Sequence, residues 1–220
     1  MSRLFIVRHG NTFAPGEPPR RIGARTDLPL VASGMAQART LGDWFVANGI
    51  DFALALAGPL ARTLTTAATI LAHAARPPAI EIAGWLAEID HGPDEGEHET
   101  AVRARIGPEG LAAWDQTATA PPGWIVNAPA RIAAWRAILD APPPGNTLLV
   151  TSNGAARFAF LARPELKRPD SLKLRTGAYA EIRCDKAGTL TLAAWNVRPD
   201  TPEAQVAQPS LGANRLQPPA

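Results

Sequence analysis

Residues 8–12 have the types and the order needed to bind and attack a phosphoryl group. They read Arg-His-Gly-Asn-Thr and directly follow the apolar run 4–7, which is typical of a β-strand. Ligands of open α/β sheets bind at the carboxyl ends of such strands. A neutral imidazole such as that of His9 attacks phosphorus through one nitrogen when an acceptor holds the proton of the other. The segment therefore predicts phosphoryl chemistry at a strand end.

The neighbours of His9 supply what this chemistry requires. Arg8 carries a permanent charge on a planar group that matches phosphate oxygens, and a nearby cation also favours the neutral imidazole. Gly10 lets the backbone turn sharply and approach a ligand closely. Asn11 and Thr12 bear small polar side chains that can donate hydrogen bonds. We expect these residues to form a phosphate site around a nucleophile.

A second cation comes after another short apolar run. Residues 54–57 (Leu-Ala-Leu-Ala) predict a strand, and the apolar pattern after them predicts a helix. Gly58 before Pro59 predicts the helix start, with the proline at the first helical position. Arg62 would then project from the opening turn, beside free backbone N–H groups that attract anions. We expect Arg62 to be a second phosphate ligand, although a solvated helix arginine is the simpler alternative.

The third element is a loop dense in carboxylates. Residues 86–96 read Leu-Ala-Glu-Ile-Asp-His-Gly-Pro-Asp-Glu-Gly. Glu88 would have its pKa raised by a nearby phosphate dianion, so it could protonate a departing alkoxide as the general acid. Asp90 is the fallback candidate. The alternative is that these acids only solvate a surface loop.

These motifs together resemble the histidine phosphatase superfamily, which contains cofactor-dependent phosphoglycerate mutases and many phosphatases. The resemblance covers roughly residues 3–198. Residues 8–12 match the family's opening motif, and residues 25–30 are similar to the segment that leads into its first helix. Residues 59–63 resemble the segment with the second phosphate arginine, and residues 86–96 resemble the region of the proton donor. The four motifs occur in the family's order.

The resemblance implies the fold. We expect an α/β protein, a three-layer sandwich with a mostly parallel central sheet flanked by helices, as in phosphoglycerate mutases. Residues 1–198 would form a single domain, with a lid region at about 88–145. Residues 199–220, rich in Pro, Gln and Ala without an apolar period, are expected to be a mobile tail.

Hydrophobic patterns place further elements. A helix is expected after Ser33 and should end near Asn48–Gly49, and helical pieces are expected around 111–114 and 132–139. The proline-rich segment 120–123 separates these two pieces, and a second one at 142–145 ends the helical stretch. A buried strand is expected from Leu148, and two more at 177–182 and 190–192.

The sequence departs from the family pattern at one catalytic position. The family places a second histidine just before a glycine, and this chain has Asn153 before Gly154. The Asn153 amide still donates a neutral hydrogen bond. Exchanging a charged donor for a neutral one costs about 1–1.5 kcal/mol of transition-state stabilisation, or about tenfold in rate. Asn153 is also suited to cap the next helix.

The resemblance and the residues together predict a metal-independent phosphatase. Arg8 and Arg62 would bind the phosphoryl group of a small phosphorylated substrate, His9 would attack it, and Glu88 would protonate the leaving oxygen. We expect no cofactor and no metal, because two guanidiniums supply the charge that magnesium provides in other phosphoryl-transfer sites. Five residues are expected to contact substrate besides these: Asn11, Thr12, Arg21, Asn153 and Gly154.

Three alternatives stay open. Phosphoglycerate mutase-type transfer is less favoured, because residues 88–92 read Glu-Ile-Asp-His-Gly where the mutases have Glu-Arg-His-Tyr-Gly. A phosphate-binding protein with weak or no turnover would result if Asn153 disarms the pocket. A metal protein is a third alternative, since histidines and carboxylates bind divalent ions; it would use Asp90, His91, Asp94, Glu95, His98 and Glu99.

Composition restricts the class of protein. The 220 residues are 46% hydrophobic, which suffices for a sizeable core, and no apolar stretch is long enough to span a bilayer. The net charge of +2 and the scattered arginines argue against nucleic-acid binding. Arg20 and Arg21 are adjacent and could hold a second anionic group of the substrate. The single cysteine, Cys184, excludes an internal disulfide, and no signal peptide is evident. We expect a cytoplasmic protein that could form a homodimer.

Overall fold

The computed structural model describes residues 1–199, so the predicted tail lies outside the described residues apart from Pro199. A six-stranded sheet has the order β3-β2-β4-β1-β5-β6. Strands β1 to β4 run parallel, whereas β5 is antiparallel to both of its neighbours. The bounds are β1 Ser2–Arg8, β2 Leu54–Ala57, β3 Ile80–Ile82, β4 Gly145–Thr151, β5 Tyr179–Cys184 and β6 Leu190–Val197. The predicted α/β class and mostly parallel sheet are confirmed.

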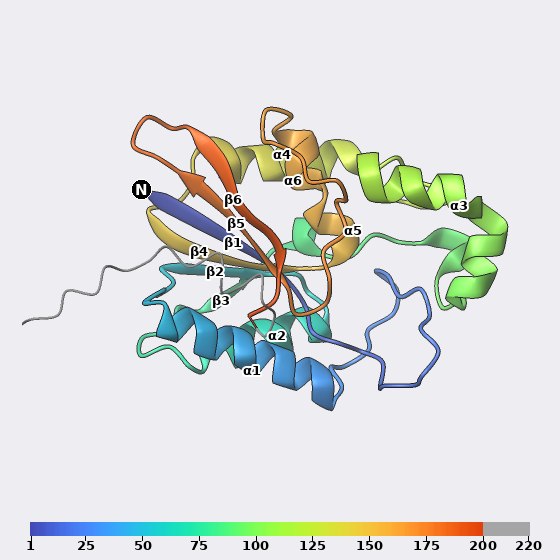
Figure 1. The fold of residues 1–220 in the computed structure, drawn as a ribbon, viewed down its shortest axis with the longest axis horizontal. Coiled ribbons are helices and arrows are strands. Elements are labelled where there is room, and N and C mark those ends of the chain that lie inside the picture. The colour runs from blue at the N-terminus through green and yellow to red at the C-terminus, as the bar shows by residue number, and fades with distance from the viewer. Residues whose placement is uncertain (200–220) are drawn as a thin grey trace, which may run out of the picture.

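Helices cover both faces of this sheet (Figure 1). Helices α1 and α2 lie on one face, and α4 and α6 lie on the other. The bounds are α1 Ala32–Ala47, α2 Ala61–Leu71, α3 Glu99–Thr117, α4 Ala128–Asp140, α5 Asn153–Ala156 and α6 Phe158–Ala162, with short 3₁₀ turns at Gly84–Leu86 and Gly92–Asp94. The arrangement is the three-layer sandwich that the sequence predicted.

Strand β1 explains why the sandwich has two cores. Side chains alternate between the two faces of a strand, and all four apolar residues of β1 are fully buried. Leu4 and Ile6 enter the core that includes residues of α4 and α6, whereas Phe5 and Val7 enter the core that includes residues of α1 and α2. A strand buried on both faces reads as an unbroken apolar run, as residues 4–7 do.

The parallel strands bring the predicted motifs to one edge of the sheet. Strands β1, β2 and β4 are in register, with Val7 and Ala57 both paired to Val150. Their carboxyl ends therefore lie together, and the chain leaves them at His9, Gly58 and Ser152.

Two local expectations at these ends are wrong. Helix α2 begins at Ala61 after the extended N-cap Leu60, so Pro59 lies in the turn rather than at the first helical position. Proline fixes φ at a value that turns accept as readily as helices. Helix α5 begins at Asn153 itself with Ser152 as its N-cap, so Asn153 caps no helix. Arg62 remains in the opening turn of α2.

The region 88–145 separates into two parts. Helix α4 packs on the sheet, with Trp135 and Leu139 in the core. Helix α3 extends beyond the edge of the sheet (Figure 1), and it bends at Gly107, which has a φ of 79° before Pro108. Within residues 1–199, no helix has the length and apolarity needed to cross a membrane.

Candidate active site

A cavity of about 770 Å³ lies at the carboxyl edge of the sheet. The segment after β1, the segment 88–91, helix α3 and the segment 173–176 all line it. Of the nine predicted site residues, six are in its wall: Arg8, His9, Asn11, Thr12, Arg21 and Glu88. Arg62, Asn153 and Gly154 do not line the cavity, but the charge of Arg62 acts on His9, and the Gly154 N–H donates to Glu88. The structure therefore gathers the predicted residues, in two layers.

His9 is held in the state that attack requires. Its side chain is almost wholly buried, and Nδ1 lies 2.8 Å from the carbonyl oxygen of Gly10. A carbonyl can only accept, so Nδ1 carries the proton and Nε2 keeps a free lone pair. Burial, followed by the charges of Arg8 and Arg62, lowers the pKa of His9 well below 6.5. The imidazole is therefore neutral at physiological pH.

Two arginines interact with His9: Arg62 is fully buried and Arg8 is half-buried. Arg8 donates from Nη1 to the carbonyl of Leu174 at 2.8 Å, and burial lowers its pKa to about 10. Arg62 donates to the carbonyls of Thr26 at 2.6 Å and Gly23 at 3.1 Å. The Nε atom of each is buried without a hydrogen-bond partner among the described residues. Each guanidinium is therefore held by hydrogen bonds from its Nη atoms, and its Nε–H remains free to donate to a ligand.

Close glycine contacts fix the segment that carries His9. A Cβ on Gly10 would lie 2.3 Å from the carbonyl oxygen of Gly34, and a Cβ on Gly34 would lie 2.2 Å from that of Asn11. No real Cβ approaches so closely, so the two glycines let this segment contact the start of α1. The Gly10 N–H also donates to Oγ1 of Thr66 at 3.2 Å.

Glu88 lies in the cavity wall with both carboxylate oxygens occupied. Oε1 accepts the N–H of Ile89 at 2.9 Å, and Oε2 accepts the N–H of Gly154 at 3.2 Å. Burial raises the pKa of Glu88, but His91, these two N–H groups and Arg62 outweigh it, and the pKa lies below 4.5. Glu88 is therefore ionised when no phosphate is bound, and a proton must reach it before it can act as an acid.

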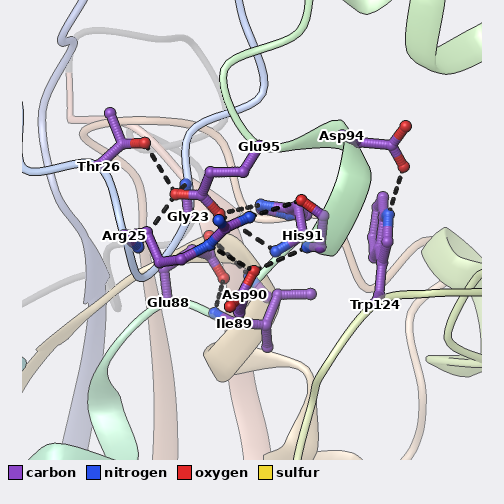
Figure 2. Close-up of polar contacts among 12 residues, drawn as sticks. Gly23, Arg25, Thr26, Glu88, Ile89, Asp90, His91, Asp94, Glu95 and Trp124 are labelled. Atoms are coloured by element: carbon purple, nitrogen blue, oxygen red, sulfur yellow. Dashed lines mark hydrogen bonds and ion pairs between the residues drawn. The ribbon is translucent and has the colours of Figure 1, made fainter.

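The other acids of the loop hold the loop together (Figure 2). Glu95 accepts the N–H groups of Gly23 and Arg25 and the hydroxyl of Thr26. Asp94 accepts the indole N–H of Trp124 at 2.6 Å and is paired with Arg105. No three His, Cys, Asp or Glu side chains within residues 1–199 gather as metal ligands would. The described residues therefore give no support to the metal alternative, and Asp94 and Glu95 are hydrogen-bonded within the protein rather than only solvating the loop.

The side chain of Asn153 is hydrogen-bonded to the segment that contains Leu174. Its Oδ1 accepts the N–H of Leu174 at 2.8 Å, and the Leu174 carbonyl in turn accepts Nη1 of Arg8. Its backbone carbonyl accepts Nε of the buried Arg157 at 3.2 Å. Its Nδ2 donates to no residue within 1–199. Asn153 therefore helps to place Arg8 and keeps one amide donor unused.

Several wall residues were not predicted from the sequence. Ser33 and Arg103, from α1 and α3, are two of them. His91, which the sequence analysis named among the loop residues, also lines the cavity and is almost wholly buried beside Trp124. Lys173, Arg175 and Thr176 precede β5, and Arg198 lies just after β6. The two cations Lys173 and Arg175, separated by one residue, are a sequence signal that could have identified this segment as part of the site.

Comparison with known proteins gives consistent results. A model of the histidine phosphatase superfamily (branch 1) matches residues 4–198. A 2,3-bisphosphoglycerate-dependent phosphoglycerate mutase of Rhizobium etli is 30% identical over 161 residues, which cover 70% of this chain and 76% of that protein. A second mutase, from Methylobacterium, is 31% identical over 168 residues, 73% of this chain and 80% of its own.

Solved structures share the fold. Bacillus stearothermophilus YhfR gives a TM-score of 0.70 at 23% identity, covering 89% of this chain and 97% of its own. A mycobacterial glucosyl-3-phosphoglycerate phosphatase gives 0.69 at 19% identity, covering 89% and 98%. At such identities the likeness establishes the fold alone.

Proposed function

The chain belongs to the histidine phosphatase superfamily, and on that premise we propose that it is a metal-independent phosphatase acting through a phosphohistidine on His9. The observation that carries the proposal is the state of His9. Its Nδ1–H donates to the Gly10 carbonyl, and its pKa is lowered by Arg8, which lines the cavity, and by the fully buried Arg62. A neutral imidazole between two cations is suited to attack a phosphate dianion.

The phosphoryl group binds to the unused donors of Arg8 and Arg62. Nε2 of His9 attacks phosphorus in line, and the bond to the leaving oxygen breaks. The Nδ2 amide of Asn153 donates one neutral hydrogen bond to the phosphoryl group. Water then attacks the phosphohistidine, so that the P–N bond breaks and phosphate leaves. The two guanidiniums offset the charge on the phosphoryl oxygens in a site of low dielectric.

Glu88 moves the proton in both steps. A bound phosphate dianion raises the pKa of a carboxyl next to it, which counters the N–H groups that now hold Glu88 ionised. Glu88 then protonates the leaving alkoxide, and as a carboxylate it accepts a proton from the attacking water.

The test is release of inorganic phosphate from a panel of phosphomonoesters with a chelator present. Wild type is expected to turn over, whereas His9→Ala loses turnover and any acid-labile phosphoenzyme. The matched control is His73→Ala, because His73 is paired with Asp43 away from the cavity and its loss should not change the rate. Loss of turnover with chelator and its return with a divalent ion would refute the metal-independent mechanism.

Phosphoglycerate mutase-type transfer is the second candidate, because the curated relatives of 30% and 31% identity carry that name. It predicts that labelled phosphate passes from His9 to a phosphoglycerate faster than to water. A phosphate-binding protein, the outcome if Asn153 disarms the site, predicts phosphate affinity without product in either assay.

A further inference from the structure

The cavity wall contains a buried imidazole that the mechanism above does not use. His91 lines the cavity together with Arg8, His9 and Glu88, and its side chain is almost wholly buried. The ring makes no hydrogen bond within residues 1–199, and Nδ1 is buried without a hydrogen-bond partner. Buried polar atoms are ordinarily hydrogen-bonded. The state of this nitrogen therefore requires an explanation.

A buried carboxylate faces this nitrogen (Figure 2). Nδ1 of His91 lies 3.9 Å from Oε2 of Glu95, and the two side chains are 5% and 6% exposed. The same Oε2 accepts the backbone N–H of His91 at 3.2 Å. Gly23 packs against both groups, since a Cβ there would lie 2.6 Å from Nδ1 and 2.3 Å from Oε2. A proton on Nδ1 would therefore have an acceptor about 1 Å beyond hydrogen-bond length.

Trp124 fixes the ring of His91. The two rings meet edge to face, with centroids 4.5 Å apart and planes at 85°. The indole N–H of Trp124 donates to Asp94 at 2.6 Å, and Asp94 is paired with Arg105. Nε2 of His91, unlike Nδ1, is not among the buried unpartnered atoms, so it is open to the cavity that His91 lines. One nitrogen thus faces a carboxylate, and the other is available to a ligand.

Four charged groups act on the protonation of His91. Glu88, Glu95 and Asp94 favour the imidazolium, whereas burial and Arg21 oppose it. Burial has the largest effect and lowers the pKa of His91 to about 4, so the ring is neutral in the free protein. A phosphate dianion in the same cavity adds further negative charge and should raise this pKa by about three units. Binding of the dianion would therefore be coupled to uptake of a proton.

We propose that His91 is a further catalytic residue of this site. With a phosphoryl group at His9, the imidazole is protonated, donates Nε2–H to a phosphoryl oxygen and donates Nδ1–H to Oε2 of Glu95. It supplies the charged imidazole donor that the neutral amide of Asn153 does not. The proton comes from solvent when the dianion binds and returns to solvent when phosphate leaves, and His91 forms no covalent bond. This inference rests on the proposed phosphatase function and adds a residue to it.

NMR measures the protonation state directly. The chain has four histidines, so ¹⁵N-labelling of histidine gives four ring systems, and substitution of each histidine assigns them. At about pH 6, we expect His91 to be neutral in the free protein and protonated when sulfate, a tetrahedral dianion, saturates the site. His73 is the internal control, because it is paired with Asp43 and does not line the cavity.

The ring signals separate the two proposals. If sulfate changes the His9 signals while His91 stays neutral, the role of His91 is overturned and the phosphatase proposal is unaffected. If sulfate changes neither ring, no anion binds beside His9, and both proposals fail. If sulfate protonates His91 but no phosphomonoester is hydrolysed, the phosphatase proposal fails and the charged donor is supported as an anion ligand.

Kinetics test whether the donor acts in the transition state. His91→Gln replaces the imidazolium with a neutral amide donor, so we expect kcat to fall about tenfold, with KM changing less. His98→Gln is the matched control, because His98 is exposed in the same loop and lies outside the cavity wall. A wild-type kcat in His91→Gln would overturn the proposal.

A double-mutant cycle tests whether His91 serves the same phosphoryl group as Asn153. We expect Asn153→His to raise kcat more in His91→Gln than in wild type, because it then supplies the only imidazolium donor. Equal gains in the two backgrounds would mean that the two side chains act on different groups, which contradicts the proposal.

Discussion

The surroundings of His9 keep its imidazole neutral. Burial and two arginines lower its pKa, and a backbone carbonyl selects its tautomer. The same arginines are the groups expected to bind phosphate. In the proposed mechanism, one pair of cations thus serves both to keep the nucleophile unprotonated and to hold the group that it attacks.

Exchange of Asn153 tests what the second family histidine contributes. In Asn153→His, Nε2–H of the imidazole adds a donor to the phosphoryl group, and the phosphate dianion favours protonation at Nδ1, which charges this donor and replaces the bond that Oδ1 now accepts from the Leu174 N–H. We expect kcat to rise about tenfold, measured as phosphate release under saturating substrate. Asn153→Ala is the control and should lower kcat, because it frees the loop that holds Arg8. An unchanged rate in Asn153→His would mean that the site has adapted to asparagine.

The positions of single site residues could be predicted from the sequence where these residues directly follow a predicted strand or apolar run. Residues 8–12 and Glu88 stand beside strands or apolar runs, so their place was evident from the pattern. The structural tasks of Asp94 and Glu95 could not be predicted, because their partners Trp124 and Gly23 are 30 and 72 positions away. The same applies to Lys173, which reaches the cavity only through the path of the chain before β5.

At the scale of elements, α5 and the segment 86–91 fit closely. The Gly154 N–H donates to Glu88, and a Cβ on Gly154 would lie 2.1 Å from Oε1 of Glu88. The first turn of the four-residue helix α5 thus sets where Glu88, the proposed general acid, lies. Only glycine leaves room for the carboxylate there.

Gly154→Ala should therefore reduce activity with little effect on folding. The added methyl displaces the Glu88 carboxylate, so we expect kcat to fall by about 10²-fold or more, the range of general acid catalysis, with KM changing less. Gly84→Ala is the matched control, because a Cβ there meets no atom within 4 Å. Similar kcat values for the two variants would contradict the role of Glu88. Circular dichroism confirms that both are folded.

Most strands and helices were predicted, including the four-residue strand β2 at Leu54–Ala57, but strand β3 was not. The helix expected after Ser33 and the strands expected at 177–182 and 190–192 are present as α1, β5 and β6. Strand β3 was missed because its three residues pair with one neighbour only and carry no usable period. The start of α2 was misplaced because a Gly-Pro pair fits a turn as well as a helix start.

At the scale of the whole molecule, buried histidines make stability depend on pH. Burial lowers the pKa of His91 to about 4, and that of His9 also lies well below 6.5. The unfolded chain takes up protons near pH 6.5, where the folded protein does not. Acid therefore favours the unfolded state. Glu88 lies outside this window, because its pKa is below 4.5.

The free energy of unfolding should thus fall between about pH 7 and about pH 5.5, by about 1 kcal/mol for each of the two histidines. Urea titrations at the two pH values measure it. His91→Gln removes one titrating group, so we expect its decrease to be about half that of wild type. An identical decrease in the variant would show that His91 is not a buried neutral group.

The central position of β1 also bears on how the chain folds during synthesis. Residues 2–8 pair with β4 at 145–151 and with β5 at 179–184, so the first strand made finds its neighbours only when most of the chain exists. At roughly 5–20 residues per second, synthesis takes about ten seconds or more to reach them. Throughout that time the apolar run 4–7 has no sheet to join. The nascent chain therefore leaves this apolar segment unpaired until late in synthesis, and a fragment that lacks β4 and β5 has no sheet to hold His9 in place.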